Sequence, residues 1–268
     1  MPKSRQVKTR GESRSSPAGL TRINKYLSSS GVTSRRKADK MISSGRIRVN
    51  GRIIRELGTK IDPRRDKIEV DGRGVSSRDN LVYVLMNKPR DLVTTLHDEK
   101  GRRGVLDIVK VRERIYPVGR LDRNTTGVLL LTNDGELANR LMHPKHLALK
   151  VYKATLDRPI RERELTRLKK GVFLDGSVTI PDELYVLPGS NAMEVGIAVH
   201  EGKNHLVRRI FENIDIRVVH LDRYSYAGLT HHGLQRGGWR FLGKQEISAL
   251  RKFVGLESSE GNPNPDRG

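Results

Sequence analysis

The sequence predicts an α+β fold: a small N-terminal domain, then a larger domain built on a mixed, mainly antiparallel β-sheet with flanking helices. The chain of 268 residues is long enough for one small and one large domain. The composition changes after GVSSRDN, residues 74–80, which is typical of a linker. Beyond this linker, candidate strands outnumber candidate helices and do not alternate with them, which favours the α+β class.

Both ends of the chain are predicted to lack a fixed fold. Residues 1–18 carry basic residues at five positions, separated by Ser, Gly and Pro, which indicates a disordered basic arm with or without a function. Residues 257–268, ESSEGNPNPDRG, indicate a disordered tail. The ordered chain is therefore expected to begin near residue 19 and to end near residue 256.

The first domain, residues 19–73, is predicted to contain two helices and a small sheet. Ile23 and Leu27 lie four residues apart, which indicates one helix, and Ser34 is a candidate N-cap for the next. Alternation of apolar and polar residues around Asn50-Gly51 predicts a hairpin, because this dipeptide suits a tight two-residue turn. IDPRRDKIEVDG, residues 61–72, adds a further strand.

The polar side of these helices is strongly basic, and Asp39 is the acid that interrupts it. A solvated surface is the ordinary interpretation of such residues, but the shortage of acids favours a patch that binds a polyanion. Its predicted RNA-binding residues are Arg22, Lys25, Arg35, Arg36, Lys40 and Arg46.

The second domain is predicted to span residues 81–256. Helical periodicity is strongest after Asp134, a candidate N-cap. Helices are predicted at residues 135–142, 161–171, 203–214 and 244–254, and strands at 81–87, 114–119, 126–132, 151–156, 183–187, 193–199, 216–224 and 239–242.

Charge and composition narrow the classes of partner and location. Lys and Arg total 52 against 31 Asp and Glu, a formal net charge of +21, which points to nucleic acid. No apolar stretch approaches the length of a membrane span, and the N-terminus lacks the apolar core of a signal peptide. The absence of cysteine fits a cytoplasmic location. Metal binding is not expected, since the histidines lack ligand spacing.

Asp122 raises the question of function most directly. It stands between Arg120 and Arg123, a few residues ahead of the apolar run VLLLT at residues 128–132. A carboxylate at such a place can cap a turn, pair with an arginine, or act as a base or nucleophile. From spacing alone, a structural role is favoured over catalysis.

The stretch GRLDRNTTGVLLLTNDGEL, residues 119–137, resembles the signature motif of RNA pseudouridine synthases. The branch it resembles modifies ribosomal RNA and carries an N-terminal S4 domain, which residues 22–51 resemble in turn. The resemblance covers about residues 20–255 in family order. Its other segments are VLMNKP at 84–89, LKVYKATL at 149–156, EGKNHLVRRIFE at 201–212 and RGGWRFL at 236–242.

Two positions depart from the family pattern. His205 and Leu206 stand where the family commonly has Arg-Gln, so an RNA contact near residue 205 is not carried over. Asp91 stands where glycine is usual, so the turn after Lys88-Pro89 is expected to differ.

The resemblance implies isomerisation of uridine in RNA to pseudouridine, without a cofactor or a metal. It implies three catalytic residues: Asp122 as the carboxylate, Arg208 as its ion-pair partner and Tyr152 as the ring against the flipped base. Asp122 would attack C1′ or remove a neighbouring sugar proton, and the sequence does not choose between these routes. Of the RNA-binding residues, Arg120 would enter the vacated stack or hold a phosphate, and Lys88 would line the entrance to the site.

The sequences of these motifs look most similar to those of the large-subunit type. The expected substrate is therefore 23S ribosomal RNA, free or in a pre-ribosomal particle. A uridine of 16S ribosomal RNA is the alternative. A monomer is expected. Two other hypotheses stay open. One is a non-catalytic RNA-binding or ribosome-assembly factor, and the other is a DNA-binding regulator that uses residues 34–44 as a recognition helix.

Overall fold

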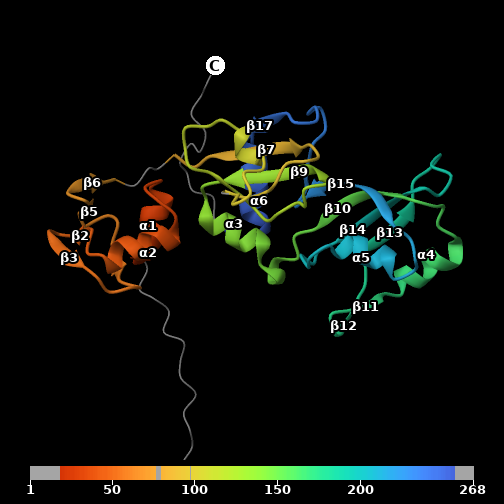
Figure 1. The fold of residues 1–268 in the computed structure, drawn as a ribbon, viewed down its shortest axis with the longest axis horizontal. Coiled ribbons are helices and arrows are strands. Elements are labelled where there is room, and N and C mark those ends of the chain that lie inside the picture. The colour runs from red at the N-terminus through yellow and green to blue at the C-terminus, as the bar shows by residue number, and fades with distance from the viewer. Residues whose placement is uncertain (1–18, 77–79, 97, 257–268) are drawn as a thin grey trace, which may run out of the picture. The chain divides into compact units, whose positions relative to one another are not determined.

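The computed structural model describes residues 19–76, 80–96 and 98–256 (Figure 1). The chain divides into two compact units, residues 1–78 and 79–268. The predicted basic arm and C-terminal tail lie outside the described residues, as do residues 77–79 of the predicted linker. No helix in the described part of the chain is long and apolar enough to cross a membrane.

The first unit packs two helices on small sheets. The helices are α1 (Ile23–Ser29) and α2 (Arg35–Ser43), and the Ser34 side chain caps α2 by accepting a hydrogen bond from the amide of Lys37, as predicted. The Asn50-Gly51 hairpin is also confirmed. A four-stranded antiparallel sheet has the order β3 (Arg52–Ile54), β2 (Ile47–Val49), β5 (Ile68–Val70) and β6 (Arg73–Val75), and β1 (Thr21–Arg22) pairs with β4 (Lys60–Ile61).

The second unit is built on one nine-stranded sheet, and the predicted α+β class is confirmed (Figure 1). Its central pair, β15 and β9, is parallel, whereas the other pairings are antiparallel. The order is β13 (Glu183–Val186), β14 (Glu194–Val199), β10 (Lys150–Leu156), β15 (Val218–Tyr226), β9 (Thr125–Thr132), β7 (Tyr83–Lys88) and β17 (Trp239–Phe241), with β16 (Leu229–Thr230) on β15 and β8 (Tyr116–Pro117) on β9.

Two sets of helices cover the two halves of this sheet. The set over β7 and β9 is α3 (Gly135–Met142) and α6 (Lys244–Phe253), and α3 begins at the predicted cap Asp134. The set over β10 and β14 is α4 (Glu162–Lys169) and α5 (Leu206–Glu212). Short 3-10 turns lie at Val105–Asp107 and Pro144–His146, and β11 (Val172–Leu174) pairs with β12 (Ser177–Thr179) in a hairpin that the sequence pattern did not predict.

Strand β9 is buried on both faces. Leu130 packs toward α3 and α6, whereas Leu129 and Leu131 pack on the other face with residues from the segment after β7. This two-sided burial explains the continuous apolar run, because alternation is seen only where one face meets water. The predicted core role of VLLLT is therefore confirmed, and β9 gives the turn before it a rigid base.

Gly127 sets the approach of β15 to β9. Its φ is +102°, and a Cβ built there would lie 2.2 Å from the carbonyl oxygen of Arg223. Only glycine tolerates this backbone conformation and this contact together.

We predict that Gly127→Ala lowers the free energy of unfolding by about 2 kcal/mol or more, because the new methyl group must push β15 away from β9. Denaturant unfolding measures the change. Gly202→Ala is the matched control, since a Cβ at residue 202 meets nothing within 4 Å and its φ is not positive. Equal stabilities of the Gly127→Ala variant and the wild type would contradict the role given to this glycine.

Candidate active site

Asp122 lies in the turn that leads into β9, and its side chain is 41% exposed. It lines a cavity of about 850 Å³ whose other walls come from β10, β15 and the loop of residues 199–207. A second recess beside it is also lined by Asp122, together with Arg123, His205 and Arg208. Asp122 is therefore a carboxylate held at an open cavity and not a buried structural acid.

The Lys88 ammonium fixes the backbone of this turn from beneath. The side chain is fully buried and donates to the carbonyl oxygens of Asp122, Arg123 and Thr125 at 3.1, 3.2 and 2.9 Å, as well as to Pro89 at 3.1 Å. The sequence-based placement of Lys88 at the entrance to the site, in contact with RNA, is therefore wrong. Three of its four partners come from a turn more than thirty residues away in the chain, a contact that local patterns do not reveal.

Lys88 keeps its charge at neutral pH. Burial lowers the pKa of Lys88 to about 8, and the nearby carboxylates of Asp122 and Asp91 oppose this shift. Below pH 8 the group is thus an ammonium that can donate to the carbonyl oxygens around it. Hydrogen bonds to a charged group contribute about 1.5–3 kcal/mol each, more than neutral ones.

Two threonines complete the framework of the turn. The buried hydroxyl of Thr94 donates to the carbonyl oxygen of Leu121 at 2.7 Å. The backbone amide of Thr125 donates to the carbonyl oxygen of Asp122 at 3.1 Å. Leu121 itself is buried against the core beside β9. The residue before Asp122 and the residues after it are therefore held by different contacts, so the backbone on both sides of Asp122 is fixed.

Asp91 occupies the position where the family pattern has glycine, and it adopts the backbone conformation that glycine favours. Its φ is +65°, in the left-handed region that Asp tolerates better than most residues. Its amide donates to the carbonyl oxygen of Arg123 at 2.9 Å, and its carboxylate pairs with the Arg123 guanidinium at 3.0 Å. Asp91 therefore adopts a glycine-like backbone conformation and adds a contact to the Asp122 turn, and whether this turn differs from that of the family stays a prediction.

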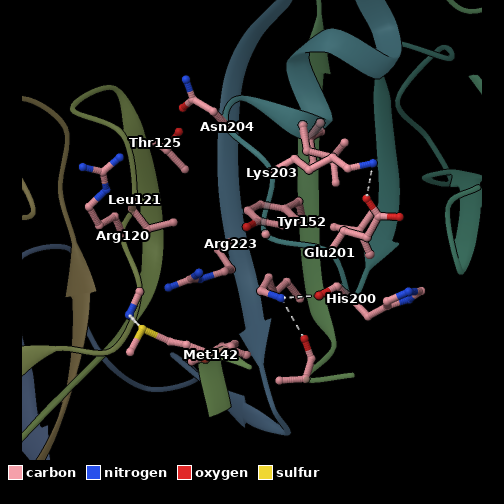
Figure 2. A pocket seen from close by; sticks show the side chains of 18 of the residues that line it. Arg120, Leu121, Thr125, Met142, Tyr152, His200, Glu201, Lys203, Asn204 and Arg223 are labelled. Carbon is pink, nitrogen blue, oxygen red and sulfur yellow. Dashed lines mark hydrogen bonds and ion pairs between the residues drawn. The ribbon is translucent and has the colours of Figure 1, made fainter. Parts of the chain in front are cut away.

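Tyr152 lies on β10, opposite Arg223 of β15 in the strand register, and both residues line the cavity (Figure 2). Figure 2 shows them on neighbouring strands, with Arg120 and Leu121 on a separate segment across the hollow. Tyr152 is half-buried between two apolar clusters. The structure thus brings Asp122, Tyr152 and the exposed Arg120 to one cavity.

The predicted ion pair between Asp122 and Arg208 is absent from the salt bridges of the described residues. Arg208, on α5, donates instead to the carbonyl oxygen of Val218, although it lines the recess that Asp122 lines. The basic group near Asp122 is His205, with its Nε2 3.6 Å from the carboxylate Oδ1. His205 stands at the start of α5 with a φ of +51°. It is one of the two residues at which this chain departs from the family pattern, and its ring is the one that lies beside Asp122.

The predicted basic patch of the first unit is exposed. Arg22, Lys25, Arg35, Arg36 and Lys40 are all open to solvent on or beside α1 and α2, and Asp39 is hydrogen-bonded to Asn24. Arg46 is exposed as well, but its guanidinium pairs with the Asp71 carboxylate, which neutralises part of its charge.

Sequence reasoning missed Arg223 and Lys150, two cavity residues on strands. The sequence feature that could have marked them is a basic residue within a strand whose other residues are about half apolar: Lys150 in KVYKATL and Arg223 in VVHLDRYSY. Such residues are common on exposed strand faces, so the pattern alone did not mark them.

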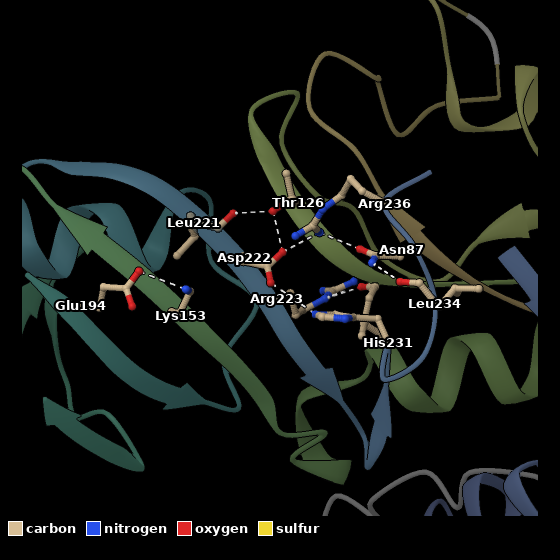
Figure 3. Close-up of polar contacts among 11 residues, drawn as sticks. Asn87, Thr126, Lys153, Glu194, Leu221, Asp222, Arg223, His231, Leu234 and Arg236 are labelled. Atoms are coloured by element: carbon tan, nitrogen blue, oxygen red, sulfur yellow. Dashed lines mark hydrogen bonds and ion pairs between the residues drawn. The ribbon is translucent and has the colours of Figure 1, made fainter. Parts of the chain in front are cut away.

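Asp222, on β15, anchors a polar network beside the β15–β9 pair (Figure 3). Its carboxylate accepts hydrogen bonds from Thr126 at 2.5 Å and Arg236 at 2.8 Å, and His231 lies 3.3 Å away. Burial acts to raise the pKa of Asp222, but the bonds from Thr126 and Arg236 hold it below its usual range. Because neighbouring residues of a strand point to opposite faces, this network supports the sheet behind Arg223.

Comparison with known proteins identifies the family. Residues 82–213 match the RNA pseudouridylate synthase family model, and residues 21–66 match the S4 domain model. A Bacillus subtilis protein named ribosomal large subunit pseudouridine synthase B is 43% identical over 240 residues, which cover 88% of this chain and 97% of the relative. An Aquifex aeolicus protein named uncharacterized RNA pseudouridine synthase is 41% identical over 240 residues, covering 88% and 96%.

A solved structure described as a pseudouridylate synthase matches with a TM-score of 0.62 at 28% identity, covering 85% of this chain and 99% of that one. An S4 domain followed by this catalytic fold defines an enzyme that binds and modifies RNA. The chain belongs to the RNA pseudouridine synthase family, as its resemblance predicted, in the branch with an N-terminal S4 domain.

We predict that Lys88→Met lowers turnover at least about 100-fold, because the turn that presents Asp122 loses its central donor and misplacement by about 1 Å carries a penalty of that size. The carbonyl oxygens around residue 88 also lose their partner, so the free energy of unfolding falls. Single-turnover pseudouridine formation and denaturant unfolding measure the two effects. Lys153→Met, at an exposed lysine of β10, is the control. Full activity of the Lys88→Met variant would contradict the positioning role.

Proposed function

We propose that the protein converts a specific uridine of ribosomal RNA to pseudouridine, with Asp122 as the catalytic carboxylate. The observation that carries this proposal is that Asp122 projects from a rigid turn into the 850 Å³ cavity that Tyr152 also lines. A cavity of this size is large enough to take a single nucleoside.

The reaction breaks the C1′–N1 bond and forms a bond from C1′ to C5 of the same uracil, so C5 loses its proton. An ionised Asp122 serves either route: it attacks C1′, or it removes the C2′ proton to give a glycal. Both routes need an unprotonated oxygen held at the sugar. The fixed backbone around Asp122 supports that role, because positioning lowers the entropic part of the barrier.

The uridine must leave its stack before it can enter the cavity. Flipping the uridine costs about a few kcal/mol of stacking and pairing energy, and contacts between the protein and RNA phosphates elsewhere offset this cost. We assign Tyr152 to the face of the flipped base and Arg120, exposed at the rim, to the vacated stack or a phosphate. The patch of Arg22, Lys25, Arg35, Arg36, Lys40 and Arg46 supplies affinity for folded RNA.

Arg208 is proposed to pair with Asp122 once RNA covers the site. Both residues line one recess, and exclusion of water strengthens the attraction between them. A paired arginine keeps a carboxylate ionised and fixes its direction.

The substrate is proposed to be large-subunit ribosomal RNA, free or in a pre-ribosomal particle. Support comes from the Bacillus subtilis relative named for the large subunit, at 43% identity. The reaction would then take place in the cytoplasm. The protein is further proposed to act as a monomer.

We predict that Asp122→Asn lowers tritium release from 5-tritiated uridine in ribosomal RNA by about 1,000-fold or more, as expected when an enzyme loses its reacting group. RNA affinity stays within about a factor of two, because phosphate contacts dominate it. Asp157→Asn, which also removes one carboxylate from a surface pair, is the matched control. Undiminished tritium release by the Asp122→Asn variant would exclude the mechanism.

Deletion of the gene should remove one pseudouridine from 23S ribosomal RNA, and expression of the wild type but not of the Asp122→Asn variant should restore it. Mapping of pseudouridines in both ribosomal RNAs measures this. Loss of a 16S site would overturn the large-subunit assignment, and unchanged modification with defective subunit assembly would favour a non-catalytic factor.

A further inference from the structure

Arg223 is a charged side chain with an unused donor at the wall of the catalytic cavity. It is only 2% exposed, and its Nε donates to the carbonyl oxygen of Val128 at 2.8 Å. Its Nη2 is buried and has no hydrogen-bond partner. A buried guanidinium nitrogen without a partner is costly, so a ligand atom that fills the gap gains that energy.

The charge around Arg223 is not balanced within the protein. Its guanidinium stacks over the Tyr226 ring at 4.8 Å, and the Lys150 Nζ lies 6.0 Å from the same ring. No salt bridge of the described residues includes Arg223 or Lys150, and Lys150 donates to the carbonyl oxygens of Ala148 and His200. Burial, together with the Arg223 charge, lowers the pKa of Lys150 to about 8. This end of the cavity therefore favours a ligand that carries or develops negative charge.

The position of Arg223 favours a base oxygen over a phosphate. Arg223 lies opposite Tyr152 in the strand register, on the cavity wall where an aromatic ring is available to stack. A phosphate is strongly hydrated and would have to be stripped of water to reach a guanidinium this deeply buried. A uracil carbonyl oxygen is carried on a flat ring, needs one or two donors, and enters with less desolvation.

We propose that Arg223 is a further catalytic residue, which donates from Nη2 to a carbonyl oxygen of the flipped uracil and stabilises the charge that develops there. The inference rests on the proposed function, since it takes uridine as the substrate. Lys150 adds positive charge at the same end of the cavity.

The chemistry explains why a cation belongs at this place. When the C1′–N1 bond breaks, its electron pair stays with N1 and spreads onto O2 and O4 of the uracil. In one route the Asp122 oxygen bonds to C1′ as N1 leaves; in the other it takes the C2′ proton. The leaving uracil is anionic in both. When C5 then bonds to C1′, the Asp122–C1′ bond breaks in the first route, and in the second the proton held by Asp122 returns to C2′. C5 finally loses its proton to solvent and N1 takes one up, so the product is an isomer of the substrate. A preorganised donor at the carbonyl oxygen stabilises this charge more than the neutral ground state.

The test compares Arg223→Gln with wild type on RNA that carries uridine, 2-thiouridine or 4-thiouridine at the target position. Loss of one such donor lowers turnover about 100-fold in other enzymes, and we expect a similar fall here. Sulfur accepts hydrogen bonds poorly, so one of the two thio substrates should react more slowly with wild type. The ratio of the uridine rate to the thiouridine rate should fall to about one in the Arg223→Gln variant, because the hydrogen bond that the sulfur weakens is already absent there.

Arg209→Gln is the matched control: it removes the same charge from an arginine of α5 that pairs with Asp175 at the surface, and it should keep wild-type turnover. The thio ratio is taken within each variant, so a partly unfolded Arg223→Gln sample still gives a valid result. Arg223→Lys keeps the charge and should recover part of the turnover.

Two results would overturn the inference and leave the proposed function intact: wild-type turnover by Arg223→Gln, or an unchanged thio penalty in it. A weaker RNA affinity with a shallower salt dependence and normal turnover would also overturn it, because that pattern marks a phosphate contact. Failure of wild type to release tritium from any ribosomal RNA would defeat the proposed function itself, and the role of Arg223 with it.

Discussion

The site depends on one buried ammonium. Lys88 gathers carbonyl oxygens from Pro89, Asp122, Arg123 and Thr125 around a single nitrogen, under a turn that has no regular secondary structure. Carbonyl dipoles pointing at one place repel each other unless a cation lies between them. The lysine therefore holds the Asp122 turn in a conformation that the residues of the turn would not keep by themselves, and it links that conformation to the buried strand β7.

The architecture around this contact follows from the parallel pairing of β9 with β15. The two strands come from distant parts of the sequence, and Gly127 allows their backbones to approach. The pairing brings the Asp122 turn beside the strand that carries Arg223, while Asp222 and its partners support β15 from the other face. One wall of the cavity thus carries the carboxylate, and the adjoining wall offers basic groups.

The sequence predicted the parts of the structure that depend on local pattern. The α+β class, the Asn50-Gly51 hairpin, the caps Ser34 and Asp134 and the buried run of β9 each have a local signature. The prediction for Lys88 was wrong because lysine is usually exposed and its carbonyl partners are remote in sequence. Arg223 was not predicted for a related reason. Its side chain is buried because it packs on Tyr226 and because β15 pairs with β9, and the local sequence pattern predicts neither contact.

A crystal structure of the Asp122→Asn variant, bound to a ribosomal RNA fragment that contains the target uridine, would test the role of Asp122 most sharply. We expect a flipped uridine in the cavity, with C1′ about 3–3.5 Å from the side chain of residue 122 and the turn around Lys88 unchanged. A uridine still stacked in the RNA, or bound away from residue 122, would contradict it.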